Sequence, residues 1–334
     1  MGLSIGSPQT HTTGEARASL NYAVTHDVDE QAALLTGWNQ SYAQLSAGVF
    51  KGSISETSFA GLHLFLEQTD SELFQTGELP PNLCAVGVPL RFSGLANFCG
   101  ASTSGEALHV FSGRNGFEFH TPSGLVMAGI VVDVDDVAAA FSDEEQLAVF
   151  STLNEPHLRR AGPSITETLR HLILGAFEVL RENPHLADDE MHIQAMKSAL
   201  VSNLAQALAD DQPGNTSSTI PPARRWLIVA AARDLIMDHP DMPMTIADLC
   251  RALGISRRNL QYCFQEVLGI SPGAFLRIVR LNGARRAIKT CNSVTDAATT
   301  WGFWHFGRFA HDYKAMFGEL PSETYRRHHG NVLL

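Results

Sequence analysis

Residues 246–261 read IADLCRALGISRRNLQ, and this stretch predicts the fold of the C-terminal part of the chain. Thr245 and Asp248 have the three-residue spacing of a helix N-terminal cap, and Leu253-Gly254 ends that helix. Ser256 then caps a second helix after a short turn. Two short capped helices joined by a tight glycine-containing turn are typical of a helix-turn-helix unit.

A second unit of the same kind follows toward the C-terminus. Its first helix ends near Trp301-Gly302, and its second begins at His305 and ends at Phe317. A long helix of about 17 residues connects the two units. Helices are expected at 224–238, 245–253, 256–268, 271–289, 293–301, 305–317 and, as a short last turn, from 321.

The outward positions on the second helix of each unit suit DNA. Apolar residues hold each helix pair together and leave polar side chains outside. Arg, Asn and Gln have donors and acceptors that match base edges in the major groove. The outward residues are Arg257, Arg258, Asn259, Gln261, Tyr262 and Gln265 in the first unit and His305, Gly307, Arg308, His311 and Lys314 in the second.

Charge divides the chain of 334 residues in two. Residues 221–334 hold 15 Lys and Arg against 9 Asp and Glu, a net charge of +6. Residues 1–220 hold 9 against 26, a net charge of −17. The segment 210–222 between them is rich in turn-forming and small polar residues and predicts a linker. The basic part therefore suits a polyanion, and the acidic part has another task.

Residues 27–209 predict a β-rich domain. We expect strands at 48–59, 62–67, 84–90, 108–111, 116–120 and 125–132, and helices at 27–45, 134–141, 144–150, 165–181 and 191–209. Residues 1–26 are predicted to be flexible. The fold class is α+β: a β-barrel, cupin-like sensor domain with flanking helices, followed by an all-helical domain at 223–334.

The stretch quoted first resembles the first helix-turn-helix of AraC/XylS-type transcription regulators. The segment from Ala298 to Ser322, with Gly302-Phe303, Phe309 and Tyr313-Lys314, is similar to that family's C-terminal signature. The resemblance covers about 110 residues and implies a sequence-specific DNA-binding transcription regulator, an activator in preference to a repressor.

The resemblance also implies roles for single residues. Base contacts are assigned to Arg257, Arg258, Gln261 and Tyr262 in one major groove and to His305, Gly307, Arg308 and His311 in the next. Phosphate contacts are assigned to Ser256, Arg280, Arg285 and Lys314. Arg224, Arg225, Arg277, Arg286 and Lys289 are interpreted as further backbone contacts or solvated charge.

The N-terminal part carries a narrower resemblance. The pattern from Trp38 to Glu56 is similar to the sensor domain of ethanolamine-operon regulators within that family, and Trp304-His305 has the same character. This implies a small amine or amino alcohol as effector, held by aromatic faces and a carboxylate. The candidate residues are Trp38, Tyr42, Phe50, Glu56 and Glu67.

The expected partners are double-stranded promoter DNA, RNA polymerase, the effector and a second copy of the chain. The helices at 165–181 and 191–209 are expected to carry the dimer contacts, and no cofactor besides the effector is expected. No apolar run approaches 18 residues, no secretory signal is visible, and the five cysteines include no CxxC pair. These features predict a cytoplasmic protein without a membrane span.

Two other classes of protein stay open. A cupin-type metalloenzyme would use His63, Glu67, His109 and His120 as metal ligands, although His63 and Glu67 lie about 13 Å apart in an extended strand. A DNA-binding regulator without an effector would leave an acidic domain of about 200 residues without a purpose. No catalytic residue is assigned and no GxSxG or Walker-type motif occurs, so an enzyme is not expected.

Overall fold

The computed structural model describes residues 20–91, 93–210, 224–238 and 244–330. Its N-terminal part contains two antiparallel β-sheets. The seven-stranded sheet has the order β1 (Asn21–Thr25), β3 (Gly52–Phe59), β4 (Leu62–Thr69), β11 (Leu125–Asp133), β6 (Leu83–Arg91), β9 (Leu108–Ser112) and β12 (His157–Arg159). The five-stranded sheet has the order β2 (Asn39–Gln44), β5 (Leu73–Glu78), β10 (Phe117–Thr121), β7 (Ala96–Phe98) and β8 (Ala101–Thr103).

The two sheets pack face to face around an aromatic core. Phe65 and Phe111 extend from the seven-stranded sheet, and Phe98 and Phe119 extend from the five-stranded one. A Cβ atom at Gly129 of β11 would overlap the Phe65 ring, so the glycine lets that ring lie against the strand. Burial of each such ring stabilises the domain by about 2 kcal/mol.

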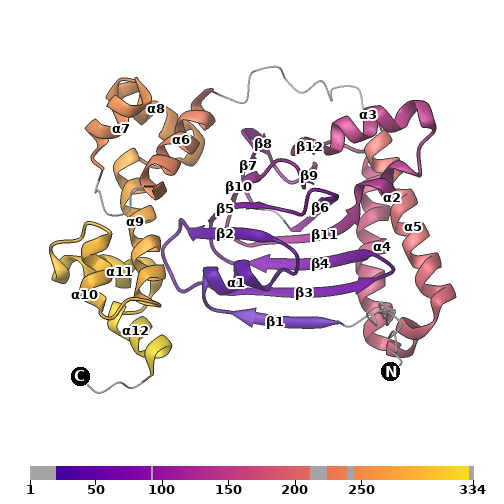
Figure 1. The fold of residues 1–334 in the computed structure, drawn as a ribbon, viewed down its shortest axis with the longest axis horizontal. Helices are drawn as coiled ribbons and strands as arrows, with labels where there is room; N and C mark the ends of the chain where they lie inside the picture. The colour runs from indigo at the N-terminus through magenta and orange to yellow at the C-terminus, as the bar shows by residue number, and fades with distance from the viewer. Residues whose placement is uncertain (1–19, 92, 211–223, 239–243, 331–334) are drawn as a thin grey trace, which may run out of the picture.

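Two long helices cover the outer face of the seven-stranded sheet (Figure 1). These are α4 (Pro163–Glu182) and α5 (Glu190–Ala209), preceded by α2 (Val134–Ala138), α3 (Asp143–Leu153) and, between the long pair, the 3-10 turn η1 (Pro184–Asp188). The buried side chains that pack against the seven-stranded sheet include Leu169 and Ile173 of α4 and Leu200 and Leu204 of α5. No helix within the described ranges is both long and apolar enough to cross a membrane.

The C-terminal helices lie on the opposite side of the sheets from α4 and α5 (Figure 1). They are α6 (Arg224–Asp238), α7 (Ile246–Leu253), α8 (Arg257–Leu268), α9 (Pro272–Ile288), α10 (Val294–Thr300), α11 (Phe306–Phe317) and α12 (Pro321–His329). The predicted caps are confirmed: Thr245 and Asp248 form a capping box, Gly254 ends α7 in the left-handed conformation, and Ser256 caps α8.

Several expectations for the N-terminal part are wrong. The helix expected at 27–45 is limited to α1 (Val28–Leu34), and residues 39–44 form β2 because they pair with β5. The described strands form two sheets with free edges, so neither closes into the expected barrel. Residues 21–25, expected in the flexible N-terminal segment, form β1 and pair with β3. The expected linker at 210–222 lies outside the described residues apart from Asp210.

Candidate nucleic-acid interface and ligand pockets

The first candidate DNA-contacting surface lies on α8. Ser256 accepts a hydrogen bond from the Asn259 amide at 3.2 Å, which fixes the start of the helix. Buried Leu260 and Phe264 hold α8 against the core, and this leaves Arg257, Arg258 and Gln261 exposed. Within the described ranges, no ion pair involves Arg257 or Arg258, so both guanidinium groups are available to an external partner.

Tyr262 has a neighbour that the sequence did not reveal. The Arg225 guanidinium lies 4.7 Å from the centroid of the Tyr262 ring, and it also pairs with Glu266 at 3.3 Å. The ring is half exposed. Arg225 thus covers one face of Tyr262 and extends the positive surface from α6 to α8.

The second candidate surface lies at the start of α11. His305, Gly307, Arg308 and His311 are exposed there, as the sequence predicts, and Lys314 is exposed one turn further on. Arg308 lies close enough to Arg277 that burial and the Arg308 charge together lower the pKa of Arg277. Arg277 itself pairs with Asp312 and remains partly exposed, and its interpretation as a backbone contact or solvated charge stays a prediction.

The residues assigned to phosphate differ in their surroundings. Ser256 and Lys314 are exposed. Arg280 is half buried and donates a hydrogen bond to the Met244 carbonyl at 2.6 Å. Arg285 is 2% exposed and pairs with Asp27 and Glu319, each at 3.2 Å. A side chain so enclosed cannot reach a phosphate in this arrangement, which corrects its assignment.

The basic end of α9 binds the N-terminal domain. Arg286 pairs with Asp29 at 2.7 Å, and Lys289 pairs with Asp27 at 2.6 Å and with Asp29 at 2.7 Å. Burial would raise the pKa of Asp27, but the charges of Arg285 and Lys289 outweigh it and lower the pKa to about 2. Arg286 and Lys289 are therefore ion-paired with this domain in this arrangement, which corrects their interpretation as DNA-backbone contacts or solvated charge.

Strand β2 adds neutral contacts to the same interface. The backbone N–H of Gln44 donates to Asn282 Oδ1 at 3.0 Å, and Asn282 Nδ2 donates to the backbone carbonyl of Gln44 at 3.0 Å. The Tyr42 carbonyl accepts a hydrogen bond from Arg286. Strand β2 is thus joined through its backbone to α9, the helix that connects the two helix-turn-helix units.

The predicted effector residues fall into two groups. Trp38, Tyr42 and Glu67 line one closed cavity between the sheets, with Gln75 beside them. Phe50 packs with Val28, Ala32, Tyr42 and Leu73, and Glu56 accepts hydrogen bonds from Thr36 and contacts His63 at 3.2 Å. Phe50 and Glu56 do not line that cavity, although Phe50 packs against Tyr42, which does.

The cavity between the sheets is small and polar at one end. Its volume is about 10 Å³, room for one water molecule at most. The Tyr42 hydroxyl donates to Glu67 Oε1 at 3.0 Å, and Gln31 donates to the same oxygen at 3.0 Å. Burial raises the pKa of Glu67 more than these hydrogen bonds lower it. In this conformation the site is too closed for an effector molecule.

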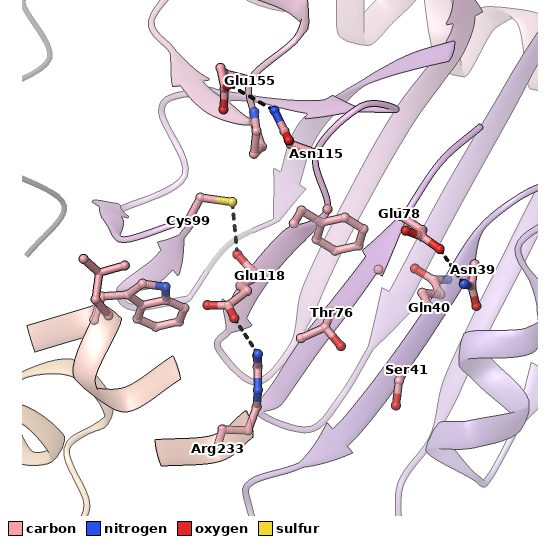
Figure 2. A pocket seen from close by; sticks show the side chains of 16 residues that line it. Asn39, Gln40, Ser41, Thr76, Glu78, Cys99, Asn115, Glu118, Glu155 and Arg233 are labelled. Atoms are coloured by element: carbon pink, nitrogen blue, oxygen red, sulfur yellow. Dashed lines mark hydrogen bonds and ion pairs between the residues drawn. The ribbon is translucent and has the colours of Figure 1, made fainter. Parts of the chain in front are cut away.

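A larger groove lies between the five-stranded sheet and α6 (Figure 2). Its volume is about 670 Å³, within the range of small-molecule sites. Figure 2 shows Arg233 of α6 pointing to Glu118 of β10, and the two pair at 2.7 Å. Glu78 and Glu155 also line the groove, so three carboxylates and one guanidinium leave a net charge of −2. The sequence offered no signal for this groove, because its walls are far apart along the chain.

The histidines considered as metal ligands are separated by the fold. His63 contacts Glu56, and His120 contacts Glu72 at 2.6 Å. His109 is fully buried between Phe98 and Phe119, and burial lowers its pKa to about 3. No group of three or more metal-binding side chains occurs in the part of the chain that the structure describes. The fold therefore does not bring His63, Glu67, His109 and His120 together as one group of ligands.

The helical domain is similar to known proteins. A family model described as a helix-turn-helix domain matches residues 249–327. The chain is 44% identical over 103 residues to the probable thc operon regulatory protein of Rhodococcus erythropolis. This match covers 30% of this chain and 31% of that protein. It is 35% identical over 96 residues to the XylDLEGF operon transcriptional activator 3 of Pseudomonas putida, 28% of this chain and 29% of that protein.

One solved structure adds to these. The crystal structure of a probable AraC family transcriptional regulator from Rhodopseudomonas palustris CGA009 is 39% identical, with a TM-score of 0.29, and the match covers 30% of this chain and 96% of that one. The chain spans less than a third of the length of the two curated relatives. Residues 249–327 of this chain are thus a helix-turn-helix domain, and the chain is similar in part to operon regulators.

Proposed function

We propose that the protein is a sequence-specific transcription regulator, an activator, that binds promoter DNA through α8 and α11. The observation that carries this proposal is the exposure of a cationic side chain at the start of both helices, Arg258 on α8 and Arg308 on α11, neither of which has an ion-pair partner among the described residues. Gln261 adds an exposed amide on α8. Helix α9, 17 residues and about 26 Å long, connects the two units. A connecting helix of that length can set two recognition helices about one DNA turn, ~34 Å, apart, which suits two successive major grooves on one face of the duplex.

The test is selection of binding sites from a pool of duplexes with 30 random base pairs. We expect wild-type protein to enrich a sequence with two conserved blocks. Arg258→Ala should lower affinity by about 1–3 kcal/mol and relax base preference within one block only. Arg251 on α7 provides the matched control, because it is an exposed arginine of the same unit that pairs with Asp248. If Arg258→Ala and Arg251→Ala select the same sequence as wild type, Arg258 does not contact bases.

We further propose that a small cationic effector, an amine or amino alcohol, binds in the acidic groove between β10 and α6. The groove has the volume that the closed cavity lacks, and its net negative charge favours a cation. Both domains contribute to its walls. A ligand bound there has different affinities for the docked and undocked domains and can thereby shift the population between them.

Thermal unfolding against a panel of small amines tests the effector proposal. A ligand at a hundredfold excess over its Kd stabilises the native protein by about 2.7 kcal/mol. Glu118→Gln should abolish this shift if the groove is the site, whereas Glu67→Gln should abolish it if the cavity between the sheets opens to take the ligand. If neither variant changes the shift, neither the groove nor the cavity is the effector site.

The remaining partners belong to the same proposal. RNA polymerase is the expected target of an activator, and a second copy of the chain is expected to dock through α4 and α5. Leu174 and Val179 of α4 and Met191 of α5 are exposed apolar side chains that support this surface. The cytoplasm is the proposed location, since promoter DNA is the proposed ligand.

A further inference from the structure

Two large aromatic side chains are exposed at the start of α11. Trp304 is 65% exposed and Phe306 is 46% exposed, on either side of the helix N-cap residue His305. Adjoining residues Gly307 and Arg308 are also exposed, so residues 304–308 form one continuous surface. Exposed apolar groups that lie together on a folded protein mark an interaction site.

Packing of the domain does not account for these side chains. A helix often begins with an apolar residue that packs against the fourth helical position, which in α11 is Phe309. Phe303 fills that role, because its ring centroid lies 4.9 Å from that of Phe309. Within the described residues, no ring contact involves Trp304 or Phe306.

The surroundings of the aromatic pair favour nucleic acid as the partner. Arg308 and Lys314 lie exposed on the same helix. A cationic surface attracts the phosphate backbone, whereas a cationic rim does not favour another basic or neutral apolar surface. In the major groove, the thymine C5-methyl group is the apolar feature that a base presents.

We propose that Trp304 and Phe306 contact thymine methyl groups in the half-site bound by α11, so that this half of the operator is read by apolar contact. The inference rests on the proposed DNA-binding function and adds the chemistry of recognition at one half-site. It distinguishes the two units. On α8 the exposed aromatic residue, Tyr262, is covered by Arg225, and the neighbouring side chains are arginine, asparagine and glutamine.

Replacement of single thymines by deoxyuridine tests the proposal, because it removes the methyl group and keeps the base pair. The probe is the duplex enriched from the random pool by wild-type protein. The block bound by α11 is the one whose base preference is relaxed by Arg308→Ala. For wild type, deoxyuridine at one or more positions in that block should weaken binding about fourfold, the effect of leaving one methyl group out of an apolar contact.

Trp304→Ala and Phe306→Ala should bind the thymine and deoxyuridine duplexes equally at the affected positions. Tyr262→Ala is the matched control on α8 and should retain the wild-type ratio in the α11 block. Continued selection of the α8 block by both aromatic variants shows that the domain is folded.

If no deoxyuridine in the α11 block changes the affinity of the wild-type protein, the inference is wrong. Aromatic variants that retain the full thymine preference also overturn it. If wild-type protein enriches no sequence at all, the proposed function fails and the inference with it. The three results are therefore distinguishable.

Discussion

Asp27 is a buried carboxylate in the contact between the two domains. It is 2% exposed and pairs with Arg285 and Lys289 of α9, and its carboxylate also accepts hydrogen bonds from the Asp29 and Glu30 amides at the start of α1. The substitution Asp27→Asn keeps the cap, because asparagine caps helices as well as aspartate does. The perturbation is therefore the loss of one buried negative charge that faces two cations.

The magnitude follows from the carboxyl pKa, which is about 2 in the folded protein and 3.8 in an unfolded chain. That difference corresponds to about 2.5 kcal/mol of unfolding free energy at neutral pH. Because the folded pKa is the lower one, this stability is fully present above pH 4. It is lost as the pH falls from about 4 to about 2. The left-over charges of buried Arg285 and Lys289 increase the cost of the substitution at neutral pH.

Urea denaturation of the full chain, followed by circular dichroism and tryptophan fluorescence, measures the effect. Asp189→Asn is the matched control, because Asp189 is an exposed N-cap of α5 remote from the interface and accepts from the Met191 and His192 amides. We expect Asp27→Asn to lower the free energy of unfolding by 2 kcal/mol or more, as estimated above, and Asp189→Asn to leave it within about 0.5 kcal/mol. A loss at Asp27 no larger than at Asp189 would refute the interface as a source of stability.

Two further predictions concern the helical domain. Gly283→Ala should destabilise the protein by about 1–3 kcal/mol, because the added methyl group overlaps the Trp301 ring, whereas Gly273→Ala on the same helix meets open space and should not destabilise it; thermal unfolding compares the two. Lys314→Ala should weaken binding to all duplexes alike and lower the slope of log affinity against log salt by about one, and an unchanged slope in a salt titration would remove Lys314 from the phosphate contacts.

The helical domain could be predicted from the sequence because its signals are local. Thr245, Ser256 and Gly254 mark helix ends within a few residues of where they act, and the structure has the same boundaries. Strand β2 could not be predicted in this way. Residues 39–44 continue a helix-like apolar spacing, and only the pairing of Tyr42 with Gln75, on a strand far along the chain, makes them a strand.

The candidate sites also differ in whether local sequence determines them. Exposure of Arg258 and Arg308 follows from the helical periodicity of their own segments. Burial of Arg285 follows from its contact with Asp27, 258 residues away, and no local pattern indicates it. The effector candidates were only partly predictable. Trp38, Tyr42 and Glu67 converge on one cavity, as predicted, whereas Glu56 contacts Thr36 and His63 instead.

Hydroxyl-radical footprinting of the wild-type protein on the enriched duplex tests the central claim most directly. Two recognition helices at the ends of the 17-residue helix α9 predict two protected blocks about 10 base pairs apart on one face of the DNA. Arg258→Ala should weaken protection of one block and Arg308→Ala that of the other. A single protected block, or loss of the same block in both variants, would contradict binding through two helix-turn-helix units.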